Sequence, residues 1–335
     1  MSARTSERGT ALIAALLLVA LMAAVAVQLM DVTRFAAFRT GQIDQRTQAV
    51  WMARGARDLA EAAFLNAGAP GRSVMRSDEL WLAGPVVFPL EAGQVVGEIH
   101  DRNNCLNINA LVEADSDVDD PLESEAQASE TRFLRQAFVR LSSDIGVPRA
   151  EAEALLAQIT DWIDADLSAE PAGAEDRTYG AYDPPYRAAN QPFSELEELR
   201  ALPVMTPALY EVYAPYLCVL PTPEQPPLNL NTLSLDQGLL LSALLDDDLD
   251  LRDAETVLFR RPPAGYETLE AVWADPLIAA LELTDAEKTR LALRSRWFEM
   301  EVSVRLAETQ FQMTQLVEWN EGGDLRRRSQ RFGAF

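Results

Sequence analysis

Five carboxylates lie close together in the middle of the sequence, with no lysine among them: Asp161, Asp164, Asp166, Glu175 and Asp176. Asp161 and Asp164 are three residues apart, so a helix ending there would place both side chains on one face. Brought together without a counter-ion, these groups would repel one another. Ca²⁺ is suited to them, since it takes about 6–8 oxygen ligands from flexible loops. The residues alone leave two interpretations open, a solvated acidic loop and a calcium site that is not an EF-hand.

Composition limits the other chemistry that the chain can carry. Its 335 residues include one histidine, His100, which excludes multi-histidine metal sites and argues against Ser-His-Asp or Cys-His catalysis. Its two cysteines, Cys105 and Cys218, form either one disulfide or two free thiols. The net charge of −23 argues against nucleic acid, because phosphate contacts need clustered Lys and Arg. One kind of enzyme stays open, in which the acidic cluster would act around a metal.

The N-terminal region contains an uninterrupted apolar segment. Residues 10–30 carry no charge, and Arg4 and Arg8 precede them. At ~1.5 Å per residue this helix would span about 31 Å, close to the ~30 Å hydrocarbon core of a bilayer. The positive-inside rule then keeps the N-terminus in the cytoplasm and places the acidic remainder across the membrane.

Three interpretations of this segment differ in what remains on the mature protein. The first is a cleaved signal peptide ending at Ala24-Val25-Ala26, and the second is an uncleaved signal anchor. The third is a short polar leader, residues 1–9, cut between Gly9 and Thr10, so that the apolar helix stays on the mature chain. The residues that follow favour the third.

A helical pattern continues well beyond the membrane segment. Apolar residues recur on one helix face, and no proline occurs between Asp31 and Asn66. The residues of this face are Met52, Ala56, Leu59, Ala60, Ala63 and Phe64. We expect one helix from the membrane to about Leu65, ended by Gly68-Ala69-Pro70-Gly71.

Strand patterns flank a long helical region. Residues 86–89 and 94–100 are predicted to be short strands, and strict alternation predicts two more at 298–306 and 311–319. A basic tail follows, with Arg326-Arg327-Arg328 and Arg331, which we expect to be solvated. The predicted fold is α+β: a long N-terminal helix packed on a small antiparallel sheet, with a large all-α domain inserted after the first hairpin.

The inserted region contains an internal repeat. Leu106-Asn107-Ile108-Asn109-Ala110-Leu111 matches the residues from Leu228 to Leu233. Each copy is followed by an aromatic residue and a Ser or Thr, Ser194 and Thr268, that suits a helix N-cap. The pair resembles helix-hairpin-helix or SAM-like units, which would make the protein a membrane-anchored DNA-uptake component. We favour a shared packing motif, in which Asn side chains bond nearby backbone, because the hairpin glycines are missing and aspartates stand there.

Two segments resemble a known family, the K-type minor pseudopilins of the type II secretion system (general secretion pathway protein K). The first is Arg8-Gly9-Thr10-Ala11-Leu12-Ile13-Ala14-Ala15-Leu16-Leu17-Leu18-Val19-Ala20. Most pilins carry Glu at the fifth mature position. The K family lacks this acid, and this chain has Ala14 there. The second runs from Asp161-Trp162 to Pro192-Phe193 and is similar to the calcium-bearing segment of that family. The resemblance covers nearly the whole chain.

The resemblance implies a pilin-type organisation and a non-enzymatic role. It implies a prepilin leader (1–9) cut before a methylated Thr10, a transmembrane segment (10–30), a pilin-like domain (31–104 and 292–335) and an inserted α-helical domain (105–291). It implies single-pass residence in the inner membrane with the C-terminal domain in the periplasm. It also implies a tip complex with the I- and J-type minor pseudopilins that supports secretion across the outer membrane. Finally, it implies structural Ca²⁺ at Asp161, Asp164, Asp166, Glu175 and Asp176.

Overall fold

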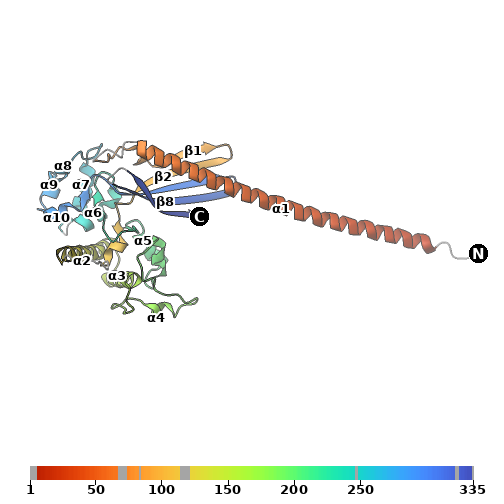
Figure 1. Cartoon of the computed structure of the whole chain (residues 1–335), viewed down its shortest axis with the longest axis horizontal. Helices are drawn as coiled ribbons and strands as arrows, with labels where there is room; N and C mark the ends of the chain where they lie inside the picture. The colour runs from red at the N-terminus through yellow and green to blue at the C-terminus, as the bar shows by residue number, and fades with distance from the viewer. Residues whose placement is uncertain are drawn as a thin grey trace, which may run out of the picture.

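The computed structural model describes residues 6–66, 74–82, 84–113, 121–245, 248–320 and 324–333. One long helix projects from a body that contains a single large sheet and many short helices (Figure 1). The start of the predicted leader, residues 1–5, and the predicted helix end at residues 68–71 lie outside the described residues.

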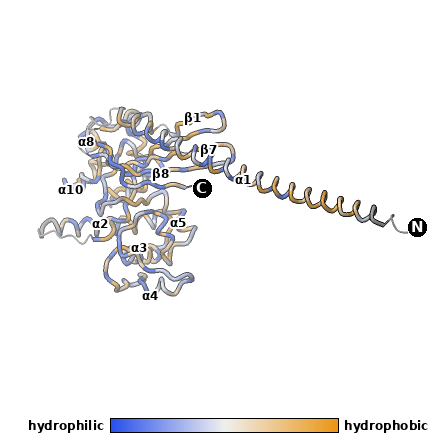
Figure 2. The backbone as a smooth tube through the Cα atoms, turned by 45° about the vertical axis from the view of Figure 1, so that its right-hand side comes forward, coloured by the Kyte–Doolittle hydropathy of each residue, from blue (hydrophilic) through white to orange (hydrophobic). Residues whose placement is uncertain are grey.

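The long helix, α1, runs from Ser6 to Asn66 and confirms the continuous helix predicted from the sequence. Its apolar N-terminal part is long and apolar enough to cross a membrane, and none of it is buried in the protein (Figure 2). Its C-terminal part packs on the sheet through Ala49, Ala53 and Phe64, all buried. Alanine at the first two positions lets the helix approach the strands closely.

Five antiparallel strands form the sheet, in the order β1-β2-β7-β8-β9. They are β1 (Val86–Leu90), β2 (Gly93–Asp101), β7 (Trp297–Leu306), β8 (Thr309–Trp319) and β9 (Leu325–Gly333). The first four confirm the predicted strands. The apolar side chains of β7 and β8 face α1 and, with α1 and Val95 of β2, form a separate core.

The arginines of the predicted basic tail are largely exposed, as expected, but the tail is not a free chain end, because Arg326–Arg331 lie in the edge strand β9. The reason is pairing with carboxylates distant in the sequence. Arg327 donates to Glu61 on α1 at 2.8 Å, and Arg328 donates to Glu318 on β8. These ion pairs add to the backbone pairing with β8 and to the apolar contacts of Leu325 and Phe332.

All remaining elements except the short helix η2 (Leu80–Leu82) lie in the region between β2 and β7, which has two halves. Its first half contains β3 (Leu106–Asn107), η3 (Ile108–Leu111), α2 (Pro121–Asp144), α3 (Arg149–Ile163), α4 (Asp176–Tyr179), η4 (Leu196–Ala201), α5 (Pro207–Tyr213) and β4 (Leu217–Cys218). Its second half contains β5 (Leu228–Asn229), η5 (Leu235–Gln237), α6 (Gly238–Leu245), α7 (Leu251–Arg260), α8 (Leu269–Trp273), α9 (Pro276–Ala279), α10 (Asp285–Lys288) and β6 (Leu291–Ala292). Residues 105–291 are called the insert below.

A short parallel ladder closes each half of the insert. β3 pairs with β4 in the first half, and β5 pairs with β6 in the second. The two halves share one apolar core, which includes Leu106, Phe138, Leu228 and Leu240. The insert also holds 36 of the 52 acidic and 12 of the 29 basic residues, a net charge of −24, so the rest of the chain is close to neutral.

A disulfide joins Cys105 to Cys218 and settles the alternatives that the sequence left open. The bridge links the start of β3 to β4, across 113 residues of sequence. It packs with Leu220, Trp297 and Leu316 in a small buried cluster between the insert and the sheet. The disulfide therefore fastens the first half of the insert at the point where it meets the sheet.

Replacing both Cys105 and Cys218 by alanine should lower the free energy of unfolding by about 2–5 kcal/mol, the usual cost of removing a native disulfide. The loss arises because an open chain of this length gains conformational freedom when it unfolds. Chemical denaturation of the full chain in detergent measures the change, and a reducing agent should no longer affect the double variant. An unfolding midpoint that stays at the wild-type value contradicts the prediction.

Candidate functional site

Three of the predicted metal-binding carboxylates converge at the end of α3. Asp164, which caps the helix, lies with Asp166 and Glu175 so that one carboxylate oxygen of each falls within 4.8 Å of the others. Asp166 is exposed and Glu175 is buried. The chain reaches this arrangement because it leaves the helix at Asp164 and returns along the loop before α4.

Several carboxylate oxygens in this group lack hydrogen-bond donors. Oδ1 of Asp164 and both oxygens of Glu175 are buried and accept no hydrogen bond from the described residues. Leaving buried polar atoms unsatisfied is costly. Burial, together with the like charges of Asp166 and Asp161, raises the pKa of Asp164 to about 6. Burial also raises the pKa of Glu175, with Asp161 the next cause. A hard divalent cation fits this group, since it would supply the missing partner to Asp164 and Glu175 and could also bind the adjacent carboxylate of Asp166.

Asp161 and Asp176 lie beside this group and bind backbone instead. Oδ1 of Asp161 accepts a hydrogen bond from the Glu170 amide at 3.0 Å. A Cβ at Gly173 would lie 2.0 Å from Oδ2 of Asp161, so glycine is needed there. Oδ1 of Asp176 accepts from the Ala188 amide at 3.2 Å. These two residues position the loop around the group, and a direct metal contact from either stays a prediction.

An aromatic cluster supports the acidic loop from the protein interior. Trp162 packs edge-on against Tyr179 at 5.4 Å between ring centroids, and stacks on Phe193 at 5.9 Å. These three side chains come from α3, α4 and the segment before η4. The packed rings fix the segments that carry the carboxylates.

The Asn repeats fasten each half of the insert internally. The side chain of Asn109 accepts from the Phe193 amide at 2.8 Å and donates to the Phe193 carbonyl at 2.9 Å. Asn231 makes the same pair of bonds with Tyr266, at 2.7 and 2.9 Å. Both asparagines are buried. The repeat is therefore a packing motif, and its polar groups are not available to nucleic acid.

The two predicted N-caps have different outcomes. Thr268 caps α8 by accepting from the Ala271 amide, as predicted. The prediction for Ser194 is wrong, because η4 begins one residue later and Glu195 is its N-cap. Glu198 accounts for the shift, since its carboxylate accepts from the amides of both Ser194 and Glu195 at 2.9 Å.

A cleft of about 1100 Å³ separates the sheet from the first half of the insert. The sheet lines it with Leu316, Arg328 and Arg331, and the insert contributes Phe193 and Asp164 among others. One edge of the acidic group thus opens onto the same cleft as the arginines of β9. Neither the cleft nor the role of Arg331 was predicted from the sequence, because both depend on contacts between distant segments.

Comparison with known proteins identifies the family. Models described as "Type II secretion system (T2SS), protein K" match residues 104–222 and 228–294, ranges that coincide with the two halves of the insert. Type II secretion system protein K of Pectobacterium carotovorum subsp. carotovorum is 32% identical over 94% of this chain and 93% of its own length. The chain belongs to this family.

Other relatives and a solved structure agree. The protein K of Klebsiella pneumoniae is 31% identical over 93% of this chain and 92% of its own length. The crystal structure of the GspK-GspI-GspJ complex from enterotoxigenic Escherichia coli contains a chain with the same fold. That match has a TM-score of 0.73 and 28% identity, and covers 89% of this chain and 100% of the other. The K-family fold predicted from the sequence is confirmed.

Calcium should stabilise this K-family protein through the acidic group. A ligand that binds only the folded state adds RT ln(1 + [L]/Kd), about 2.7 kcal/mol at a hundredfold excess over Kd. Chelation should therefore lower the melting temperature, and Asp164→Ala with Asp166→Ala should abolish the difference. Glu224→Gln, an exposed acid outside the group, is the matched control and should keep the full effect. Equal melting temperatures with calcium and with chelator contradict the site.

The same group predicts opposite pH dependences with and without calcium. In chelator, the folded protein binds a proton at Asp164 more tightly than the unfolded chain, because the pKa rises from 3.8 to about 6. Stability should then fall as pH rises from about 4 to about 6. Calcium needs the ionised group, so the stabilisation that it adds should be complete above about pH 6 and decline below it. Melting temperatures across this range test both trends, and a calcium effect independent of pH contradicts the assignment of Asp164.

Proposed function

We propose that this minor pseudopilin occupies the tip of the periplasmic pseudopilus, in a complex with the I- and J-type minor pseudopilins. It would act as a structural component that supports protein secretion across the outer membrane, without enzymatic activity. The observation that carries the proposal is the match over the full length of a chain in the GspK-GspI-GspJ complex.

The membrane arrangement follows from the charge pattern and the disulfide. The apolar part of α1 would cross the inner membrane once, with the basic N-terminus in the cytoplasm. The sheet and insert would then lie in the periplasm. The Cys105–Cys218 bridge supports this side of the membrane, because disulfides persist in oxidising compartments.

A tip position accounts for two features of the chain. The first is Ala14, where most pilins carry an acid that neutralises the N-terminal amine of the next subunit above. A subunit with no neighbour above needs no such acid, and an unpaired carboxylate in lipid is costly. The second is the insert, much of which lies at the end of the body away from the free part of α1 (Figure 1). Its bulk would obstruct the addition of a further subunit.

The acidic group would hold structural calcium in this assembly. Asp164, Asp166 and Glu175 would bind the cation, and Asp161 and Asp176 would hold the surrounding loop. Bound calcium would relieve the repulsion among carboxylates in an insert of net charge −24. The effect would be to stiffen the first half of the insert beside the sheet.

Processing should occur between Gly9 and Thr10. The site follows from Arg8-Gly9, which directly precedes the charge-free segment, and α1 would then remain whole on the mature protein. Mass spectrometry of the mature chain should show Thr10 as the first residue, carrying an N-methyl group. A chain that starts at Val27, after a signal-peptidase site, excludes the pilin-type anchor.

Removing the insert should weaken the capping of fibres. Asp101 on β2 pairs with Phe298 on β7, so a short turn can replace residues 103–296 and leave a five-stranded pilin-like domain. When the major pseudopilin is overproduced, this shortened chain should give longer or more numerous fibres than the intact chain. Circular dichroism and proteolysis must first show that it folds. A folded, shortened chain that limits fibres as well as the intact chain removes the capping argument.

A further inference from the structure

The edge of the sheet at β9 is long and open. β9 pairs only with β8 among the described residues, so one side of its nine-residue backbone has no strand beside it. The opposite edge, β1, has five residues and includes Pro89, which cannot donate to an added strand. An unpaired strand edge is a template for another chain, and proteins normally shorten or block it. β9 is not shortened, so its side chains must decide what can pair with it.

Arginines cover this edge, and the carboxylates that balance them lie beneath. Glu318 is 3% exposed and binds both Arg296 and Arg328, whose side chains are 54% and 40% exposed. On the α1 side, Glu61 is 16% exposed and binds Arg327, which is 52% exposed. At these two places the guanidinium groups are therefore more exposed than the carboxylates that they bind.

Arg326 adds a further charge to the same edge. Its side chain is exposed and makes no ion pair within the described residues. Two exposed acids lie nearby: Asp58, which is shared between Arg57 and Arg327, and Asp324, which directly precedes β9. The first part of β9, Arg326 to Arg328, thus presents three adjacent exposed guanidinium groups in a chain whose net charge is −23.

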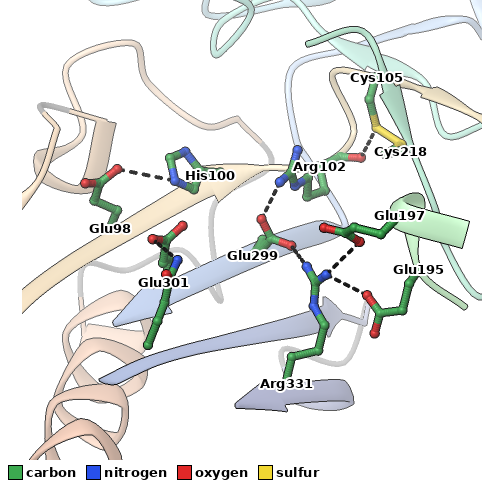
Figure 3. A network of polar contacts seen from close by, with 11 residues as sticks. Glu98, His100, Arg102, Cys105, Glu195, Glu197, Cys218, Glu299, Glu301 and Arg331 are labelled. Atoms are coloured by element: carbon green, nitrogen blue, oxygen red, sulfur yellow. Dashed lines mark hydrogen bonds and ion pairs between the residues drawn. A yellow bond between two sulfur atoms is a disulfide. The ribbon is translucent and has the colours of Figure 1, made fainter. Parts of the chain in front are cut away.

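The C-terminal part of β9 is fastened to the insert (Figure 3). Arg331 binds Glu195 at 2.7 Å and Glu197 at 3.1 Å, both from the insert, and Glu299 of β7 at 3.5 Å. Glu299 in turn binds Arg102. These contacts hold β9 in place beside the cleft, so the edge is ordered before any partner arrives. An ordered edge lowers the entropic cost of binding.

Two possible occupants fit this edge poorly. A second copy pairing edge to edge would place arginines against arginines, which like-charge repulsion disfavours. A lipid surface is too distant. Gln45, which contacts Thr309 at the membrane-proximal end of the sheet, lies 15 residues beyond Met30, about 22 Å along the helix. The arginines of β9 lie farther still from the membrane. Arg331 pairs with Thr314, five residues along β8 from Thr309, and the other arginines pair beyond it.

We propose that β9 is a docking strand for an acidic, extended segment of the I–J minor pseudopilin pair, which adds to the sheet as a sixth strand. Backbone hydrogen bonds along the edge would provide affinity, and the arginines would select acidic side chains. The partner's identity rests on the proposed function, whereas the acidic character of its segment rests on the edge itself.

Binding of the purified I–J pair to the full-length protein in detergent tests this proposal. Arg326→Glu reverses one exposed charge without leaving a buried carboxylate unpaired, and Arg326→Gln is the milder variant. Arg305→Glu, on the central strand β7 and also exposed, is the matched control. At low salt we expect Arg326→Glu to slow association at least fivefold, Arg326→Gln to slow it less, and the control to change it less than twofold. The difference should shrink at high salt.

Hydrogen exchange supplies a readout specific to strand addition. Amides of β9 should exchange more slowly when the I–J pair is bound, whereas those of the control strand β1 should not. If the pair binds without protecting β9, or binds all variants equally, the docking strand is wrong and the proposed function stands. If β9 is protected by self-association without the pair, the assignment of its occupant is overturned. If the pair does not bind the wild-type chain, the proposed function fails, and the docking strand fails with it.

Discussion

Buried asparagine side chains are the interaction on which this fold depends. An amide group can donate and accept at once, so it can replace backbone pairing where the chain changes direction. Asn103 accepts from the amides of Arg296 and Trp297 at 3.0 and 2.9 Å, joining the end of β2 to the start of β7 at the base of the insert. Asn104 accepts from the Asn229 amide at 2.8 Å, joining the first half of the insert to the second. These bonds, together with the disulfide and the ion pairs of Arg331, fix the position of the insert on the sheet.

The elements predicted correctly are those whose pattern is local. The 61-residue α1 and the strands β1, β2, β7 and β8 each repeat an apolar residue at a fixed spacing, which identifies them without knowledge of their partners. β9 has no apolar repeat, because Glu61 and Glu318 bind its arginines, and such pairs cannot be found from spacing. The disulfide was undecided for the same reason. In the acidic group, the residue types suggested a cation, but only the fold separates Asp164, Asp166 and Glu175 from Asp161 and Asp176.

Charge is divided between the two parts of the molecule in a way that matches the proposed role. The insert carries a net charge of −24, and the pilin-like remainder carries +1. Two inserts stacked on each other would repel, whereas the pilin-like part can pack closely in a fibre. The two parts face each other across the cleft, which is lined by Asp164 of the insert and Arg331 of the sheet. An electrostatic division of this kind is suited to a subunit that joins a fibre at one end and terminates it at the other.

The position of the protein on isolated pseudopili tests the central claim, that it caps the fibre, most directly. Antibody against the insert, visualised with gold by electron microscopy, measures this position without altering the chain. A tip subunit predicts gold at one end of each fibre and none along its length. Gold distributed along the fibres would contradict the account, because it would show that further subunits can be added above the insert.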